Sequence, residues 1–408
     1  MKAAGLDISL LASELLTTGR ADPYPIYRRL HARSAAAALP GDLVLVWGYA
    51  EAESALRNPW LGVEDSACLD LVSPSWREHP SRVLLNNSMV FVNGDGHERM
   101  RRLVSRAFTA RRVDDLRPAI DRRVGLLLDR LADLGAGGIP VEYMAEFAFL
   151  MPVNVVCDLL GVPEADRPGF REPVARLSAV VEPGSLYADL STADAAADEL
   201  ASYFTSLIAD RRCRPRADLL TAMASINDGA DQPLSDEELV ANAIFLLLAG
   251  FESTIGLLGN GLMLLLERPA ELARLRGCPA DAPAFVEEML RLEAPVQLTG
   301  RRAGAATTAG GISVPSGGSV IVLIGAANRD PRRFADADRF APGRPGNQCL
   351  SFGGGIHYCL GARLARLEAQ IAFPRLLRRF PDLALAGAPV RADRLNLRAY
   401  VHLPLRLR

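Results

Sequence analysis

One cysteine follows a stretch of glycines at a spacing that suits a metal-binding sulfur. Residues 351–362 read Ser-Phe-Gly-Gly-Gly-Ile-His-Tyr-Cys-Leu-Gly-Ala, and the apolar pattern after Cys359 predicts a helix over 360–380. The N–H groups at the start of a helix stabilise an anionic sulfur, and glycines let the backbone pass close to a flat ligand. A lone cysteine is usually a buried thiol, so the prediction depends on the whole stretch.

An acidic residue lies in the middle of the most apolar predicted helix. Ser235-Asp-Glu-Glu238 has the spacing of a capping box, which predicts a helix that begins there and ends near Glu267. Glu252 lies inside it, close to Gly250 and Ser253. A buried carboxylate without a partner is costly, so Glu252 needs a reason to be there.

The same helix is long enough to cross a membrane. The segment 239–266 has the length and apolar character of a spanning helix, but Asn242, Glu252 and Asn260 interrupt it. A helix that is apolar on all faces is also typical of the centre of a large soluble protein. We therefore favour a core helix and no membrane partner. The N-terminal segment lacks a long apolar stretch and predicts neither a signal peptide nor an anchor.

The composition fits a soluble enzyme. Of 408 residues, 49% are hydrophobic, which suffices for a large core, and the net charge of −2 gives no electrostatic reason to expect nucleic acid. The six cysteines form no Cys-x-x-Cys pair, so neither a disulfide framework nor a zinc site is expected. Reduced thiols predict a cytoplasmic location.

The element pattern predicts a mainly α fold with a small β-sheet region (α+β). Although the length would allow two or three domains, we expect one domain over 1–408. Helices are expected at 26–33, 97–112, 283–292 and 360–380 and through most of 113–226, with breaks at 135–140, 163, 183–184 and 212–215. Strands are expected at 43–47, 319–324 and within 395–407, and long loops at 61–88 and 328–348.

The glycine stretch resembles the haem-binding loop of the cytochrome P450 family, and the resemblance extends over nearly the whole chain. The family pattern Phe-Gly-x-Gly-x-His-x-Cys-x-Gly matches Phe352, Gly353, Gly355, His357, Cys359 and Gly361. This resemblance implies the P450 fold, built around a long central helix and a buried haem b. It implies Cys359 as the axial ligand of the iron, with Phe352 and Gly353 beside the cofactor.

Glu288 and Arg291 resemble the family's Glu-x-x-Arg pair. They are spaced i and i+3, so they lie on one helix face, although such pairs are common on any solvated helix. Their implied role is structural, because in the family the pair fixes the loop behind the haem. Residues 328–331 and 340–344 resemble that loop.

The two haem propionates would need cations. His97 and Arg101, spaced i and i+4, resemble the family's His-x-x-x-Arg, and Arg301 and His357 match two further donors. Arginine suits a carboxylate because its planar fork binds two oxygens. The alternative for His97 and Arg101 is a solvated basic helix face.

Residues 249–254, Ala-Gly-Phe-Glu-Ser-Thr, resemble the family's oxygen-activation motif. The resemblance implies that Gly250 opens a groove for dioxygen, and that Glu252 and the next hydroxyl relay protons. Ser253 departs from the usual threonine and is less fixed in rotamer, while the adjacent Thr254 is expected on another helix face. A second departure is Cys349, where relatives often carry histidine. The alternative for Glu252 is a carboxylate that reaches a water-filled cavity.

The resemblance also implies a largely apolar substrate pocket, although each of these residues could equally belong to the core. Its predicted lining is Met89, Phe245, Leu248, Ala249, Val296, Gln297, Leu298, Ala399 and Tyr400, with parts of 61–90 and 165–200 as a lid. A polyketide, peptide or terpenoid is the expected substrate scaffold.

The implied reaction inserts one oxygen atom from O2 into a small organic molecule, by hydroxylation or epoxidation. Electrons would come to this monomer from a ferredoxin and ferredoxin reductase, docking near Arg101, Arg102, Arg363 and Arg366. Ser253 leaves open an atypical oxidation, such as aryl coupling, dehydrogenation or peroxide-driven chemistry. A non-catalytic helper protein is the other alternative, and the retained Cys359 and Glu252 argue against it.

Overall fold

The computed structural model describes residues 2–182, 188–225 and 232–407. The chain forms two compact units. We call Met1–Gly62, Asp121–Leu150 and Ser253–Arg408 the sheet unit, and Val63–Ile120 and Met151–Glu252 the helical unit. All strands of the described residues belong to the sheet unit. The mainly helical class with small sheets is as predicted.

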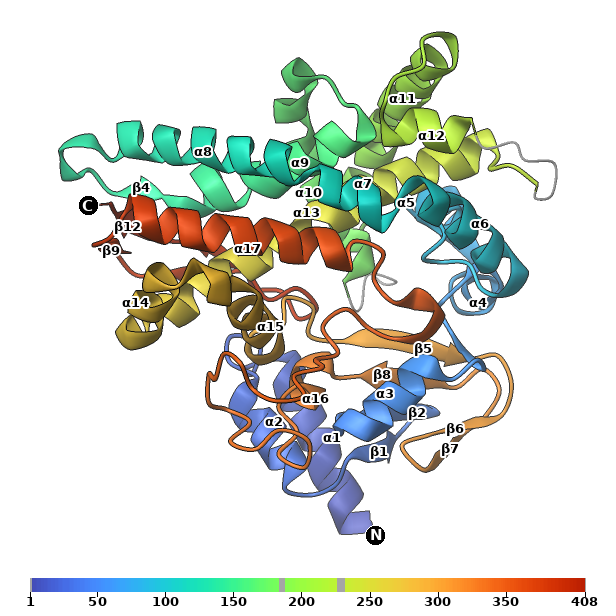
Figure 1. Cartoon of the computed structure of the whole chain (residues 1–408). Helices are drawn as coiled ribbons and strands as arrows, with labels where there is room; N and C mark the ends of the chain where they lie inside the picture. Colours follow the sequence, from blue (N-terminus) through green and yellow to red (C-terminus); the bar gives the residue numbers. More distant parts are fainter. Residues whose placement is uncertain (1, 183–187, 226–231, 408) are drawn as a thin grey trace. The chain divides into compact units, whose positions relative to one another are not determined.

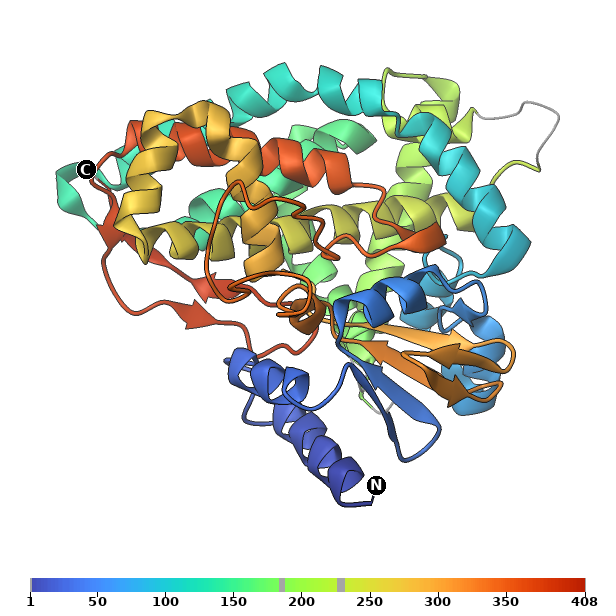
Figure 2. The same cartoon turned by 60° about the horizontal axis from the view of Figure 1, so that its bottom comes forward.

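The main sheet of the sheet unit has five strands in the order β1-β2-β8-β5-β3. Their bounds are β1 Ala36–Leu39, β2 Leu43–Val46, β3 Leu61–Gly62, β5 Thr299–Ala303 and β8 Ser319–Val322. β2 and β8 are parallel, and β5 is antiparallel to β8 with Arg301 opposite Val320. In Figure 2 the blue N-terminal strands lie beside the orange strands of the C-terminal half.

Strand β2 is buried on both faces. Its side chains alternate between the two faces, and each face packs against a different hydrophobic cluster. Val44 and Val46 join a cluster with α3 (Tyr49–Arg57). Leu45 and Trp47 join a second cluster with α1 (Lys2–Leu16) and α2 (Tyr24–His31). The predicted strand at 43–47 is therefore confirmed, and the two-sided burial explains its continuous apolar sequence.

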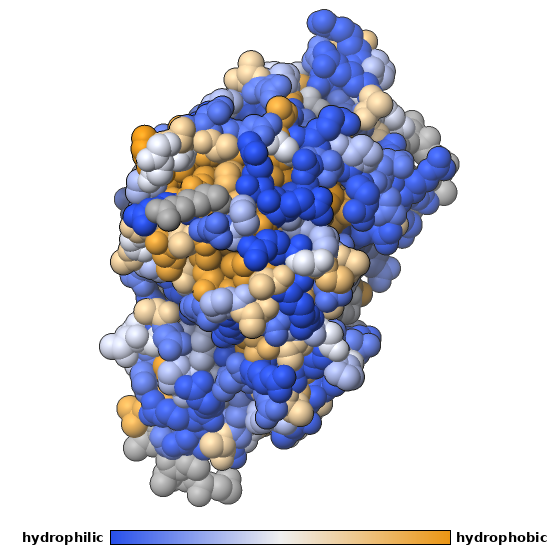
Figure 3. Space-filling model, turned by 60° about the vertical axis from the view of Figure 1, so that its left-hand side comes forward, coloured by the Kyte–Doolittle hydropathy of each residue, from blue (hydrophilic) through white to orange (hydrophobic). Residues whose placement is uncertain are grey.

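Three smaller sheets complete the sheet unit. They pair β4 (Val141–Glu142), β12 (Pro404–Arg406) and β9 (Ala384–Leu385); β10 (Val390–Arg391) and β11 (Tyr400–His402); and β6 (Thr307–Ala309) and β7 (Ile312–Val314). Large apolar side chains are exposed at Leu134, Ile139 and Leu385. Figure 3 shows the side of the molecule that carries the C-terminus, where hydrophobic and hydrophilic groups are mixed.

The sheet unit contains further helices and short turns besides α1, α2 and α3. They are α14 (Pro269–Gly277), α15 (Ala282–Leu292), α16 (Ile324–Ala327) and α17 (Ala362–Arg379), with short turns η2 (Ala136–Gly138), η3 (Met144–Ala148), η7 (Pro279–Asp281) and η8 (Gly355–His357). α17 packs against both α14 and α15 (Figure 1). The predicted helices at 283–292 and 360–380 are confirmed within two residues.

The helical unit consists of helices and turns. Its elements are α4 (Ser66–Val72), η1 (Pro74–Glu78), α5 (Pro80–Asn86), α6 (Gly94–Ala107), α7 (Ala110–Asp115), η4 (Glu164–Phe170), α10 (Arg171–Ser178), η5 (Ala179–Val181), α11 (Ser191–Cys213) and α12 (Leu219–Ala224). Helices α8 (Arg117–Leu134), α9 (Leu150–Leu160) and α13 (Asp236–Leu266) have residues in both units. α11 packs against α5, α10 and α12. The predicted break at 183–184 lies outside the described residues.

The prediction of a loop over 61–88 is wrong, because α4, η1 and α5 lie there. Prolines within a helix break it, but Pro74 and Pro80 lie in the first turns of η1 and α5. Proline is tolerated there since its missing N–H would have no helical partner. Asp65 caps α4 by accepting a hydrogen bond from the N–H of Cys68 at 3.1 Å.

α13 begins with the predicted capping box. The N–H of Glu238 donates to Ser235 Oγ at 3.2 Å, and the N–H of Ser235 donates to the Glu238 carboxylate at 2.9 Å. α13 is the one helix of the described residues that is long and apolar enough to cross a membrane, and 67% of its most apolar window is buried inside the protein. A helix that is mostly buried inside the protein is typical of a protein core.

Candidate functional site

The predicted cysteine loop is shaped by glycines. Gly353 and Gly355 have left-handed backbone angles, with φ of 72° and 64°. A Cβ atom on Gly355 would lie 2.5 Å from the carbonyl oxygen of Leu56, which no side chain tolerates. The N–H of Cys359 donates to the carbonyl of Phe352 at 2.9 Å and closes the loop. Cys359 is exposed, and α17 begins shortly after it.

Glu288 and Arg291 are completely buried and bound to each other. Arg291 donates to the two carboxyl oxygens of Glu288 at 2.7 and 2.8 Å. Its remaining N–H groups donate to the carbonyls of Asn328, Ala337 and Arg339 at 2.7–3.1 Å. One arginine therefore ties α15 to the loop that follows α16.

The carboxylate of Glu288 holds the far part of the same loop. It accepts hydrogen bonds from the N–H of Ala341 at 2.8 Å, from Asn347 Nδ2 at 3.0 Å and from Arg344 Nε at 3.4 Å. Both carboxylate oxygens of Glu288 thus accept hydrogen bonds from the loop. A buried charge needs such bonds if it is to hold the loop in a fixed position.

Asn328 and Ser351 extend this support to the cysteine loop itself. Asn328 Nδ2 donates to Ser351 Oγ at 2.8 Å, and Asn328 Oδ1 accepts from the N–H of Leu350 at 2.7 Å. Ser351 Oγ donates to the carbonyl of Leu290 at 2.6 Å. The sequence identified Asn328 only as part of a matching stretch, and the roles of these two side chains were missed.

Arg301 is a buried cation that lacks an acidic partner within the part of the chain that the structure describes. It is 8% exposed, and its Nη1 donates to Thr299 Oγ1 and the carbonyl of Gly300 at 2.9 and 2.8 Å. Among the described residues no carboxylate acts on its charge, and burial lowers the pKa of Arg301 to about 10. A buried cation without a counter-ion is costly, so Arg301 fits the carboxylate of a bound ligand.

The sheet unit therefore carries groups that fit a haem. Cys359 supplies an accessible sulfur, the glycines allow a close backbone approach, and Arg301 fits a propionate. His357 and Phe352 lie half-buried in the same loop, and the Arg366 guanidinium stacks over the Phe352 ring at 4.3 Å.

In the helical unit, the ring of His97 is fixed from one side. His97 is 2% exposed on α6, and its Nδ1 lies 2.7 Å from the carbonyl of Met89, which assigns the proton to Nδ1. The N–H of Met89 donates to Asn242 Oδ1 on α13 at 3.0 Å. Arg101 is half-buried one turn after His97.

The predicted oxygen-activation residues lie on the middle of α13. A Cβ atom on Gly250 would lie 2.8 Å from Val156 Cγ2, so this glycine is required for close packing of α13 on α9, whatever its role toward oxygen. Glu252 and Ser253 are half-buried and Ala249 is exposed. Of the other predicted pocket residues on α13, Leu248 is buried and Phe245 packs its ring edge-to-face with Phe91.

Thr254 follows Ser253 on another face of α13, and it is buried. Its hydroxyl lies beside Glu368 of α17, a carboxyl group that the sequence analysis missed. Glu368 is 1% exposed, and among the described residues its oxygens accept no hydrogen bond. Burial raises the pKa of Glu368 well above its usual value, and the Thr254 hydroxyl opposes that shift. Burial therefore favours the protonated, neutral form of Glu368.

The remaining predicted pocket residues come from two adjacent segments. The N–H of Gln297 donates to the carbonyl of Asn396 at 2.8 Å, and the N–H of Arg398 donates to that of Pro295 at 2.7 Å. These bonds place the segment with Val296 and Leu298 beside the segment with Ala399 and Tyr400.

The side chain of Gln297 is held by the protein core. The Tyr27 hydroxyl donates to its Oε1 at 3.0 Å, and its Nε2 donates to the carbonyl of Ala294 at 2.6 Å. Glu293 anchors the same region by ion pairs with Arg398 at 3.0 Å and Arg329 at 3.4 Å. No local sequence pattern indicates this support, because its members are far apart in the chain.

Comparison with known proteins agrees with this site. Residues 282–386 match the family model "Cytochrome P450". The chain is 40% identical to cytochrome P450 107B1 of Saccharopolyspora erythraea, over 85% of this chain and 84% of that protein. It is 38% identical to 6-deoxyerythronolide B hydroxylase of the same organism, over 90% of each chain.

The fold also matches a solved structure. P450BioI, in complex with an acyl carrier protein ligated to hexadec-9Z-enoic acid, has a TM-score of 0.88 and 32% identity, over 96% of this chain and 100% of that one. Both the sequence and the structure therefore identify a haem-containing monooxygenase: the chain belongs to the cytochrome P450 family.

Proposed function

We propose that this enzyme uses ferredoxin-derived electrons to hydroxylate or epoxidise a secondary metabolite. The observation that carries this proposal is the cysteine loop with its buried support, in which Glu288 and Arg291 are fully bonded behind an accessible Cys359. A helper protein would need neither. When bound, haem b activates O2, so that one oxygen atom enters the substrate and the other becomes water.

Side chains of this chain would bind both the iron and the propionates of the haem. Cys359 would ligate the iron through its sulfur, while Arg301, His357, His97 and Arg101 would bind the propionates. The buried and unpaired guanidinium of Arg301 supports this assignment most directly. The chain has no Cys-x-x-Cys-His sequence for covalent attachment, which favours haem b.

The residues on α13 would transfer protons from solvent to the O2 position. Glu252 is half-buried, so its carboxylate would exchange protons with solvent, and Ser253 Oγ would hold the proton next to the O2 position. Gly250 has no side chain, which would leave room for O2 beside the helix. Thr254 would not take part directly, because its hydroxyl lies beside Glu368.

The substrate would be a hydrophobic tailoring intermediate with a polyketide, peptide or terpenoid scaffold. One relative is named for hydroxylation of 6-deoxyerythronolide B, and one structural neighbour holds a fatty acyl group on a carrier protein. The predicted lining from Phe245 to Ala249 and at Val296 and Leu298 is apolar, which suits such scaffolds.

Redox partners are part of this chemistry, and the proposed donor is a ferredoxin, which is an acidic protein. Arg102 and Arg363 are exposed, whereas Arg366 is held by Glu287 and by the ring of Phe352. Charge reversal at Arg102 or Arg363 should slow reduction by ferredoxin at low salt and have less effect at high salt. Rates that remain unchanged would argue against this docking surface.

We also propose a single-domain monomer in the cytoplasm. The burial of the apolar window of α13 supports a soluble protein, and thiols without a Cys-x-x-Cys pair support a reducing compartment.

The test of this function measures how reducing equivalents are used. A compound library is first screened for a substrate-induced Soret shift, and the hit is then used to measure NAD(P)H consumed, product formed and peroxide released. Ser253→Ala should release more peroxide at nearly unchanged substrate affinity, and Ser253→Thr should keep or improve coupling. Glu252→Gln should lose about 10²–10⁴-fold in product formation.

The same assay separates the alternatives. Oxygen-dependent turnover with ferredoxin and its reductase supports the proposed reaction. If product forms only with added peroxide, or contains no inserted oxygen atom, the proposed reaction is wrong. The enzyme would then carry out the atypical oxidation that Ser253 leaves open.

A further inference from the structure

One carboxylate of the sheet unit lies between three arginines. Glu293, the residue after α15, is 8% exposed. It pairs with Arg398 at 3.0 Å, with Arg329 at 3.4 Å and with Arg391 at 3.5 Å. Arg329 has a second carboxylate partner in Asp338, at 2.8 Å. Within the described part of the chain, however, Arg391 and Arg398 form ion pairs with Glu293 alone.

These ion pairs join the two segments that were predicted to line the substrate pocket. Arg398 directly precedes Ala399 and Tyr400 in the chain. Glu293 lies three residues before Val296, in the other segment. The side chain of Glu293 is only 10% exposed and is surrounded by guanidinium groups, so it supports the lining and is not part of it.

The segment that follows Arg398 lies directly against α13. A Cβ atom on Gly256 would lie 3.1 Å from the carbonyl oxygen of Arg398 and 3.7 Å from Ala399 Cβ. Gly256 is three residues after Ser253, so the two positions lie on one face of the helix. Ala399 is half-buried, as is Ser253. Ala399 therefore lies beside the face of α13 that carries Ser253.

The contacts that hold this segment on α13 depend on both arginines. Asn260 Nδ2 donates to the carbonyl of Arg398 at 2.8 Å, and Asn260 Oδ1 accepts from Arg391 Nη1 at 3.1 Å. The guanidinium of Arg391 also lies over the Tyr400 ring, 4.0 Å from its centroid. Buried arginines without a carboxylate are costly, so we expect them to move toward solvent, and the segment with them, when Glu293 loses its charge.

We propose that Glu293 is a positioning residue for the substrate. By pairing with Arg391 and Arg398, it would keep Ala399 at a fixed distance from the Ser253 face of α13. That distance would limit the width of a ligand that binds beside the haem iron. This inference rests on the proposed function, because it takes Ser253 as part of the reaction site.

The experiment is a double-mutant cycle between Glu293 and Ala399 in the holoenzyme. The probes are imidazole and 1-phenylimidazole, whose free ring nitrogen binds the haem iron and shifts the Soret band. Ala399→Leu should weaken 1-phenylimidazole relative to imidazole by about 10-fold in the wild type, because the segment cannot move away from the larger ligand. In the Glu293→Gln background the same change should cost only about 3-fold, because the segment is free to move.

Two further variants separate positioning from a loss of stability. Glu293→Asp keeps the negative charge, so it should keep most of the effect of Ala399→Leu. Arg391→Gln remains informative if Glu293→Gln does not fold, because the Arg391 side chain is 22% exposed and its loss should harm folding less. It should reduce the effect of Ala399→Leu in the same direction as Glu293→Gln.

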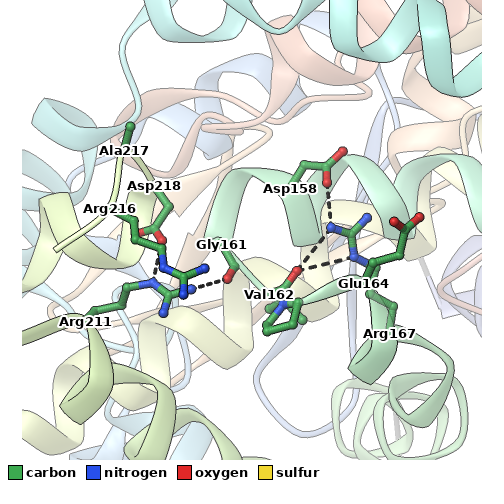
Figure 4. Close-up of a pocket in the computed structure, with 10 residues that line it drawn as sticks. Asp158, Gly161, Val162, Glu164, Arg167, Arg211, Arg216, Ala217 and Asp218 are labelled. Atoms are coloured by element: carbon green, nitrogen blue, oxygen red, sulfur yellow. Dashed lines mark hydrogen bonds and ion pairs between the residues drawn. The ribbon is translucent and has the colours of Figure 1, made fainter. Parts of the chain in front are cut away.

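The matched control is Asp218→Asn, in a polar cleft of the helical unit (Figure 4). The Asp218 side chain is 6% exposed and accepts a hydrogen bond from Arg211 Nε at 2.6 Å, so it forms a similarly buried ion pair. None of the residues that were predicted to line the substrate pocket belongs to this cleft. Asp218→Asn should therefore destabilise the protein and leave the effect of Ala399→Leu unchanged.

Two kinds of result would overturn the proposal. One is an effect of Ala399→Leu that is absent from the wild type, or that is equal in the wild type, Glu293→Gln and Arg391→Gln. The other is an equal reduction of this effect in Asp218→Asn. The carbon monoxide spectrum is recorded in parallel, since a wild type without the thiolate signature would reject the proposed function and this inference with it.

Discussion

The loop behind Cys359 and the segment around α5 differ in whether their buried charges have partners. In the loop, Glu288 and Arg291 are completely buried, and each of their polar atoms is bonded to a partner. On α5, Arg82 is almost as buried and has no partner within the described residues. The first arrangement fixes a backbone, whereas the second leaves a buried cation without a counter-ion among the described residues.

The difference follows from what each region has to do. A loop that presents a metal ligand gains from rigidity, and a buried pair provides it once all hydrogen bonds are made. A buried cation without a counter-ion is instead a cost to folding, which the packing around it has to offset. The predictions below test each side of this contrast, beginning with the largest effect.

The largest effect is expected at the exposed cysteine of the loop. Cys359→His should abolish the thiolate-type Soret band of the reduced carbon monoxide complex, because the anionic sulfur is lost. Cys349→Ala is the control, since burial raises the pKa of the Cys349 thiol and makes it a poor thiolate. A mutant at Cys359 that keeps the wild-type band would show that another cysteine is the ligand.

The buried pair should give the next largest effect. Arg291→Met leaves the Glu288 carboxylate buried without its main partner, so the free energy of unfolding should fall by about 3–5 kcal/mol. The loss is measured by urea unfolding. Arg339→Met is the control, because Arg339 is 72% exposed and its side chain should contribute less than 1 kcal/mol. Similar losses in both variants would mean that the pair does not support the loop.

These two regions also differ in how much the sequence could predict. The cysteine loop, the Glu288–Arg291 pair and α13 follow from local patterns, because glycine spacing, i and i+3 pairing and capping are all encoded within a few residues. The helices between 61 and 88 were missed for an equally local reason, since proline was weighed as a breaker and not as a first-turn residue.

What the sequence could not show are the partners that distant segments bring together. Glu293 meets Arg398 across 105 positions of the chain, and Gln297 meets Tyr27 across 270. An isolated glutamate or glutamine in the sequence is most often a surface residue, so nothing local marks it as a buried support. The same holds for Arg82, whose lack of partners is visible only once its neighbours are known.

The third prediction concerns the buried cation of the sheet unit. Arg301→Leu removes a charge-assisted contact worth about 1.5–3 kcal/mol, so haem should transfer to apomyoglobin roughly 10- to 100-fold faster. Arg302→Leu is the neighbouring control, because Arg302 donates to Ser319 Oγ at 3.3 Å and points to the other side of the strand. Equal transfer rates for wild type and Arg301→Leu would mean that Arg301 does not hold the cofactor.

The last prediction uses pH to test the buried acid between α13 and α17. Burial raises the pKa of Glu368 in the folded state above its usual value of 4.5, so the folded protein keeps a proton that the unfolded chain loses. The contribution of Glu368 to stability is therefore fully present below pH 4.5. It falls as pH rises, by up to about 1.4 kcal/mol per pH unit, until the folded-state pKa is passed.

Glu368→Gln removes this proton equilibrium while keeping the shape of the side chain. The variant should therefore gain stability relative to the wild type between pH 5 and pH 7, as measured by urea unfolding at each pH. Glu267→Gln, at an exposed position, should show no such trend. A difference between wild type and Glu368→Gln that does not change with pH would mean that Glu368 is ionised in the folded protein. In that case the carboxylate would have a partner that stabilises its charge.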